Sequence, residues 1–272
     1  MKALTLTSAF ALVLHALACG ATQRPPAAPP QPTPEPTPPL QSVILDQKGL
    51  PSETTAYMKD LLYSDRPLEK VLENIKPDRT GGDEDPWLHF ERALAHSKQG
   101  KVEEAKKELR RVVATPEGET RVLLTAWTAL RALGERPPPG EADKVRGVVC
   151  ELLNEEGVGG TLAAYADGRA RWFGSQGAGT FWEAPGDKEI DTLIHDLLKT
   201  AEPLVKKAPA SERRMPVEIE RAHFRATVLT FGGLHAVDVY GPDIDGEARY
   251  IAPTLMAAVS LLDALQKRQP AK

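Results

Sequence analysis

A proline-rich break at residues 136–140 separates two parts of the chain that have different hydrophobic patterns. Before the break, apolar residues recur at helical spacing from about residue 52 to residue 133. After it, short runs typical of strands alternate with longer amphipathic runs typical of helices. The sequence therefore predicts an α+β protein with two folding units. Their expected bounds are a helical module at 41–135, a linker at 136–142, an α/β domain at 143–266 and a disordered tail at 267–272.

The helical module contains one especially regular pair of helices. Asp85 followed by Pro86 is typical of a helix start, and Gly100 separates two amphipathic runs. The turn at Gly100 is short, so the two helices are expected to pack antiparallel. Further helices are expected at 52–75 and 120–133.

This helical pair resembles a tetratricopeptide repeat over about 34 residues. Its small, glycine, alanine and large apolar positions, and its closing proline, are matched by Ala93, Gly100, Ala105, Leu109 and, within one residue, Pro116. The resemblance implies a concave surface that binds peptides. A plain helical bundle is the alternative interpretation.

The α/β domain is expected to follow the order α-β-β-α-β-β-β-α. An apolar stripe over 145–153 predicts its first helix. Asp167 and Gly168 predict a two-residue type I′ turn between strands at 161–166 and 169–173. The other expected elements are a helix over 190–205, strands at 217–220, 223–231 and 234–240, and a closing helix over 255–265.

The stretch from about Asp143 to Leu265 resembles the roadblock / dynein light chain fold, in which helices pack on a five-stranded antiparallel sheet. The resemblance is best in residues 145–153, in the glycines that follow at 157–160, and in residues 217–220 before a strand pair. It implies protein contact and a homodimer formed through the C-terminal domain. Profilin-like and longin-like domains share much of this element order and stay open as alternatives.

The N-terminus is typical of an exported protein. Lys2 supplies a positive charge, the run from Ala3 to Ala18 is mostly apolar, and small residues precede Cys19. Residues 16–19 resemble the bacterial lipobox, which implies a signal peptide at 1–18, cleavage between Ala18 and Cys19, and a lipid on Cys19. Cleavage by the ordinary signal peptidase, giving a soluble secreted protein, is the alternative.

Residues 19–40 contain nine prolines and almost no large apolar side chain. Such a segment favours an extended, disordered linker of about 3.1 Å per residue. Gly20, in place of aspartate after Cys19, resembles the signal that sends lipoproteins to the outer membrane. We therefore expect a cell-envelope protein whose lipid anchors it to the outer membrane, facing the periplasm.

The sequence offers little for catalysis, metal binding or nucleic-acid binding. A net charge of −4 argues against a nucleic-acid partner, which needs a basic face. His89 and His96 are seven residues apart on one helix, about 10 Å along its axis, which is too far for one metal ion. His223 and His235 have no nearby serine or cysteine nucleophile in the sequence. We therefore expect no catalytic residue, no metal ligand and no cofactor.

Two further groups of residues have structural interpretations. Cys150 is expected to be a buried small hydrophobic residue, because a reactive thiol needs an exposed, electropositive setting. The three glycines at positions 157, 159 and 160 are expected in a turn, because phosphate-binding loops run from a strand to a helix.

Aromatic residues are concentrated near the predicted hairpin. Trp172, Phe181 and Trp182 are the candidate interaction residues, because tryptophan is enriched at interface hot spots. Packing of the loop beneath a helix is the alternative for Phe181 and Trp182. The preferred hypothesis is a non-catalytic, membrane-tethered scaffold with an unidentified protein partner. A small-ligand sensor in the C-terminal domain and an enzyme of unknown class are the alternatives.

Overall fold

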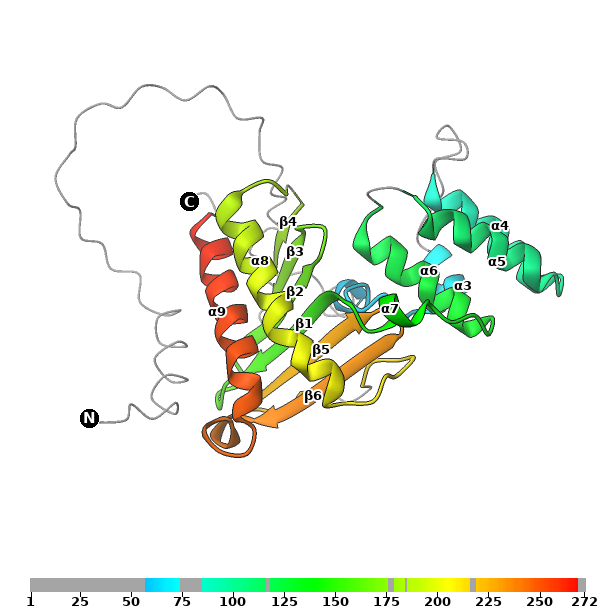
Figure 1. Cartoon of the computed structure of the whole chain (residues 1–272). Coiled ribbons are helices and arrows are strands. Elements are labelled where there is room, and N and C mark those ends of the chain that lie inside the picture. The colour runs from blue at the N-terminus through cyan, green and yellow to red at the C-terminus, as the bar shows by residue number, and fades with distance from the viewer. Residues whose placement is uncertain are drawn as a thin grey trace, which may run out of the picture.

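The computed structural model describes residues 57–73, 85–115, 118–175, 179–183, 185–215 and 219–268. The predicted signal peptide, Cys19, the proline-rich linker and residues 269–272 of the predicted tail lie outside these residues. The prediction of a disordered tail from residue 267 is wrong for its first two residues, because Lys267 ends the last helix and Arg268 pairs with Asp187 at 2.9 Å. In the described part, a six-stranded antiparallel sheet lies between two layers of helices (Figure 1). The predicted α+β class and antiparallel sheet are confirmed.

The sheet has the strand order β4-β3-β2-β1-β5-β6, so its longest strand, β1, is central. Every neighbouring pair is antiparallel. The strands are β1 (Val145–Leu153), β2 (Gly159–Tyr165), β3 (Ala170–Gly174), β4 (Gly179–Trp182), β5 (His223–Thr230) and β6 (Gly233–Tyr240).

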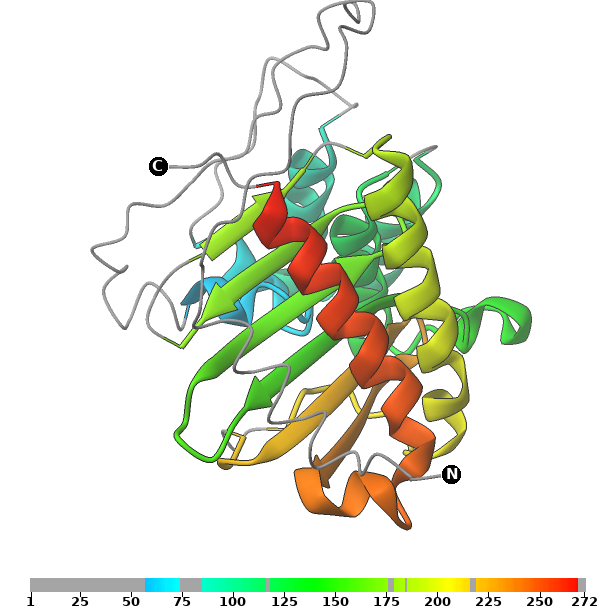
Figure 2. The same ribbon diagram turned by 90° about the vertical axis from the view of Figure 1, so that its left-hand side faces the viewer.

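The helices form two groups, one on each face of the sheet (Figure 2). One face is covered by α8 (Lys188–Ala201) and α9 (Ala252–Lys267). The other is covered by α4 (Pro86–Lys98), α5 (Val102–Val113) and α6 (Thr120–Ala132), which we call the helical layer. The short elements are α3 (Leu68–Leu72), α7 (Pro139–Ala142) and the 3₁₀ turns Glu202–Lys206, Gly241–Asp245 and Arg249–Ile251.

The predicted helical pair is confirmed as α4 and α5, and its local signals act as expected. The Asp85 carboxylate accepts a hydrogen bond of 2.9 Å from the Trp87 N–H, which caps the start of α4. Gly100 has a φ of 72°, a conformation that favours glycine at a helix end. The helix expected at 52–75 is interrupted in its described part, because residues 61–67 are not helical and Pro67 starts α3 anew.

The helix predicted over 145–153 is wrong, because this segment is the central strand β1. Val148 and Cys150 face the α8–α9 layer, whereas Val149 faces the helical layer. A strand buried on both faces is apolar at successive positions, so its sequence lacks the alternation that identifies a strand. The β-branched valines fit a strand better than a helix.

The hairpin at Asp167 and Gly168 is confirmed, but the predicted type I′ turn is wrong. Gly168 has a φ of 81°, and Asp167 is not among the described residues with positive φ. The Tyr165 carbonyl accepts a hydrogen bond from the Gly168 N–H at 3.0 Å, and the Tyr165 N–H donates to the Arg169 carbonyl at 2.9 Å. This pattern is a three-residue loop with glycine at its bulge.

Strand β4 was not expected from the sequence, and two of the three predicted turn glycines lie in β2. Gly157 is in a turn, with a φ of 77°, but Gly159 and Gly160 are strand residues. A Cβ atom on Gly160 would lie 2.2 Å from the Phe173 carbonyl oxygen, so the close strand contact requires glycine there.

The order of elements in the α/β domain is β-β-β-β-α-β-β-α, not the predicted α-β-β-α-β-β-β-α. The sheet has six strands rather than the five of the roadblock pattern. The strand predicted at 217–220 falls mostly outside the described residues, and residues 219–220 are not in a strand.

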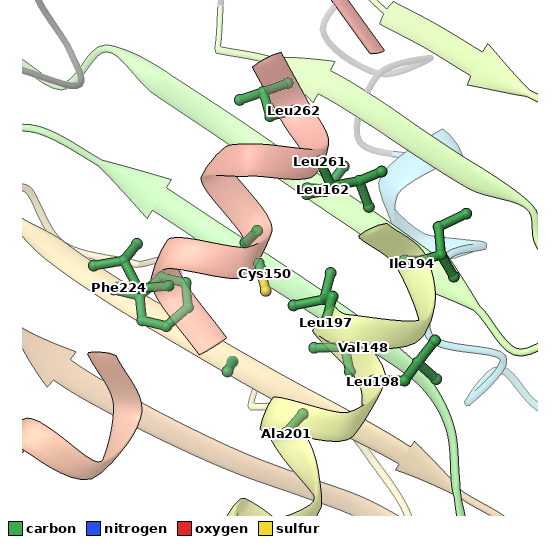
Figure 3. Close-up of a cluster of buried hydrophobic side chains, with 14 of the residues drawn as sticks. Val148, Cys150, Leu162, Ile194, Leu197, Leu198, Ala201, Phe224, Leu261 and Leu262 are labelled. Atoms are coloured by element: carbon green, nitrogen blue, oxygen red, sulfur yellow. The ribbon is translucent and has the colours of Figure 1, made fainter. Parts of the chain in front are cut away.

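Each face of the sheet has its own apolar core. Cys150 is fully buried in the core beneath α8 and α9, as predicted (Figure 3). The second core combines sheet residues such as Tyr165 and Phe173 with Phe90 and Leu130 of the helical layer. The α/β domain therefore has a core of its own beneath α8 and α9 and shares the second core with the helical module.

The expected linker at 136–142 is part of this packed structure. Residues 139–142 form α7, and the Ala142 carbonyl accepts a hydrogen bond of 2.8 Å from the Gly232 N–H. At this proline-rich sequence the chain passes from the helical layer into the sheet, and the segment is packed rather than a free hinge.

Candidate functional site

The predicted interaction residues lie in or against the two cores. Trp172 and Trp182 are 8% and 5% exposed and pack between the sheet and the α8–α9 layer. Phe181 lies on the opposite face, where its ring meets the Phe173 ring edge-on at a centroid distance of 5.4 Å. None of these three side chains lines either of the cavities described below. Trp172 and Trp182 are therefore core residues, and Phe181 packs against the second core.

His89, which the sequence placed on a helix, is buried between α4 and α5. The Nδ1 atom of His89 lies 2.7 Å from the Oε2 atom of Glu108, and both residues are less than 9% exposed. Glu108 also accepts a hydrogen bond of 2.9 Å from Arg111. Burial alone raises the pKa of the Glu108 carboxyl, but the hydrogen bond to His89 and the charge of Arg111 outweigh it and hold that pKa below its usual value.

We expect Glu108→Gln to lower the free energy of unfolding by about 1.5–3 kcal/mol near neutral pH, the range for hydrogen bonds to charged groups. Because the folded pKa is depressed, this stabilisation is present above about pH 4.3, the ordinary glutamate value. It is lost as the pH falls through the folded value. Chemical denaturation of both proteins should therefore give a difference that shrinks on acidification. Glu104→Gln, at an exposed position of the same helix, should change stability by less than about 0.5 kcal/mol.

His223 and His235 are held by local contacts, and Cys150 is buried. The Nδ1 atom of His223 lies 3.1 Å from Asp238, and the Nδ1 atom of His235 lies 2.9 Å from the Ala208 carbonyl oxygen. Burial raises the pKa of the Cys150 thiol far above its usual value, and the charge of Glu151 raises it further. Within the described ranges, no three His, Cys, Asp or Glu side chains are grouped so as to hold a metal ion.

The structure instead shows a groove of about 610 Å³ beside the helical layer. Its walls come from α3, from the facing sides of α4 and α6, and from residues 212–213 between α8 and β5. The floor is apolar, and it includes Ala93, Leu94, Leu109, Ala129 and Leu133.

The rim of the groove carries an excess of positive charge, although the whole chain is acidic. Five cationic residues and two carboxylates line the groove as a whole, namely Arg66, Lys98, Arg131, Arg136 and Arg213 against Glu69 and Glu212. Glu212 is shared by two arginines, at 2.7 Å from Arg131 and 3.4 Å from Arg136. The rim therefore retains cationic groups that its own carboxylates do not neutralise.

Arg131 fixes one wall of this groove. Its side chain is 2% exposed, and it donates hydrogen bonds to the Phe231 carbonyl and to Glu212. These bonds join α6 to the β5–β6 turn and to the 212–213 wall. The sequence could not indicate this site, because its cationic residues come from four separate segments and no local motif unites them.

Comparison with protein-family models, with curated proteins and with solved structures finds no match to this chain. Among the residues that the structure describes, no helix combines the length and the apolar character needed to cross a bilayer.

Proposed function

We propose that the protein is a non-catalytic scaffold that is tethered to the cell envelope by a lipid and binds a partner protein in the groove between α4 and α6. The observation that carries this proposal is the 610 Å³ groove with an apolar floor and a cationic rim. The occupant that fits it is a segment of protein that carries both carboxylates and apolar side chains. Charge complementarity favours such a segment over a basic or purely polar one.

The tetratricopeptide-like pattern supports the same proposal. Ala93 and Leu109, two positions that match the repeat, line the groove. Small residues such as Ala93 and Ala129 keep the facing helices from filling this space. Peptide binding in a groove between helices then depends on apolar anchors at its floor and charged contacts at its rim.

A bulky side chain placed in the groove tests whether the groove is the binding site. Ser97 lies in α4, is partly exposed and lines the groove, so Ser97→Trp should block the site. We expect a short fluorescein-labelled peptide of alternating leucine and glutamate to bind the full chain, and Ser97→Trp to weaken this binding by about tenfold or more. Fluorescence polarisation measures both affinities.

Three controls make this experiment decisive. Ser97→Ala should bind normally, and Ser260→Trp, which adds the same indole to an exposed position of α9, should bind normally too. A matched peptide of alternating leucine and lysine should bind much more weakly. Equal affinity for the two peptides, or unchanged binding by Ser97→Trp, would overturn the proposal.

The lipid anchor is proposed from residues 16–19 and is tested separately. Cys19→Ala should abolish incorporation of a labelled fatty acid and move the protein from the membrane fraction to the soluble fraction, because the thiol that receives the lipid is lost. A wild-type protein that takes up no label and is recovered in the soluble fraction would instead support the secreted alternative.

A further inference from the structure

A second cavity of about 250 Å³ lies between the segment at 60–66, the first turns of α4 and α6, and strand β3. Three arginines line it, namely Arg66, Arg121 and Arg171. Arg66 lines both this cavity and the groove, whereas Arg121 and Arg171 line only this cavity.

Two of these guanidinium groups have buried N–H donors with no acceptor. Within the described residues, neither the Nη1 atom of Arg66 nor the Nε atom of Arg121 has a hydrogen-bond partner. A buried donor that lacks an acceptor is costly, and more so when the group is charged. The two atoms therefore need an acceptor that the described chain does not supply.

The partners of Arg66 are also weak for a guanidinium group. It lies over the Tyr57 ring, with its central carbon 5.0 Å from the ring centroid. No carboxylate among the described residues forms an ion pair with it. Within the part of the chain that the structure describes, the charge of Arg66 beside this cavity is thus not compensated by an ion pair.

The two carboxylates that line the cavity already have cationic partners. Asp60 forms an ion pair with Arg214, and Glu119 forms one with the Nη2 atom of Arg121, which leaves the Nε atom of Arg121 available. Arg171 pairs with Glu183 at 2.5 Å, so the lining and its ion-pair partners together hold four arginines and three carboxylates, a net charge of +1. This charge matches a monoanion better than a dianion such as a phosphate monoester, which the two carboxylates would repel.

The rest of the lining is apolar, and it includes Leu61, Val71, Trp87 and Val122. A volume of 250 Å³ corresponds to about eight water molecules at ~30 Å³ each, so only a small ligand fits. Guanidinium groups bind carboxylates well because their planar N–H donors match the two carboxylate oxygens.

We propose that this cavity binds a small carboxylate with an apolar tail. The carboxylate accepts hydrogen bonds from the guanidinium groups of Arg66 and Arg121, and the tail contacts Trp87 and Val122. A free carboxylic acid and the C-terminal leucine of a peptide share this chemistry. Binding of such a ligand would stabilise the junction between the helical layer and the sheet.

Calorimetric titration of the full chain tests the proposal with 4-methylpentanoate and its neutral amide. We expect the acid to bind and to raise Tm, and the amide to do neither. The tripeptide Ala-Ala-Leu, with a free or an amidated C-terminus, distinguishes the sources, because only the free form presents a carboxylate. Whichever carboxylate binds more tightly identifies the source.

Arg121→Gln should weaken carboxylate binding by about 10- to 100-fold, the effect of losing one charged hydrogen bond. Arg110→Gln, which also loses an ion-paired arginine but at an exposed position of α5, should bind normally. Ser97→Trp should also bind normally, so failure of the groove and failure of this cavity can be told apart.

Three results would overturn the inference: equal binding of acid and amide, no binding of either carboxylate, or an unchanged affinity in a folded Arg121→Gln variant. The comparison of acid with amide uses the wild-type chain and does not depend on the folding of any variant.

Discussion

Residues 143–268 expressed alone, without the helical layer, should not fold to a stable monomer. This truncation would expose the face of the sheet that carries Val149, Phe173 and Leu229, all of which are 0–1% exposed in the full chain. Burying each such side chain contributes ~1.5–3 kcal/mol, about 5–9 kcal/mol for the three together. A natural domain has a total stability of about 5–15 kcal/mol, so the loss is comparable with all of it.

Gel filtration and near-UV circular dichroism check this prediction. The truncated chain should elute as aggregates and lack the tertiary signal of its tryptophans. A chain of residues 41–268 serves as the control and should behave like the full chain. If the truncated chain instead unfolds cooperatively within a few degrees of the control, the shared core is not required for folding.

Replacing Arg225 should also lower the stability of the protein strongly. This residue links three strands on the face of the sheet toward the helical layer. Its side chain is 4% exposed, and its Nη2 atom lies 2.6 Å from Asp238 of β6 while its Nη1 atom lies 3.5 Å from Glu151 of β1. Tyr63, in the segment before α3, hydrogen-bonds to Glu151. Burial raises the pKa of the Tyr63 hydroxyl, and the charge of Glu151 raises it further.

Arg225→Met should therefore lower the free energy of unfolding by about 3–5 kcal/mol, because it leaves two partly buried carboxylates without this cation. For a chain of this size, that loss corresponds to a fall in Tm of about 6–20 °C. Differential scanning calorimetry measures it. Arg249→Met removes an exposed arginine and should change Tm by only a few degrees at most.

A double variant separates loss of the ion pair from loss of packing. In the Arg225→Met background, Asp238→Asn removes one of the two carboxylate charges that have lost Arg225. It should therefore recover part of the lost stability. If Asp238→Asn lowers stability further in that background, the unpaired carboxylate is not the cause of the effect.

The parts of the fold that were predicted correctly depend on contacts between residues close in the sequence. The Asp85 cap, the Gly100 turn and the Asp167–Gly168 hairpin are local signals, and each lies where the sequence indicates. Helices α8 and α9 were also expected, because each packs on the sheet by one side and so has an apolar stripe in its sequence. The β5–β6 pair was expected from two strand-like runs on either side of Gly232 and Gly233.

The errors occur where a segment's environment is set by distant parts of the chain. Residues 145–153 read as a helix because their apolar positions fit helical spacing, yet they are buried on both faces by two different helical layers. Trp172 and Trp182 were candidates for an interface because their concentration is visible in the sequence, whereas their burial beneath α8 and α9 is not.

The amino-acid sequence alone thus determined the fold class and the positions of the capped helices and turns. It also gave the expectation of an exported N-terminus that carries a lipid. Only the tertiary structure decided that the two predicted units share a core and that β1 is the central strand. It also decided that arginines from separate segments surround a groove and a small cavity. Caps and turns arise within a few residues, whereas burial and charge clustering depend on which distant segments pack together.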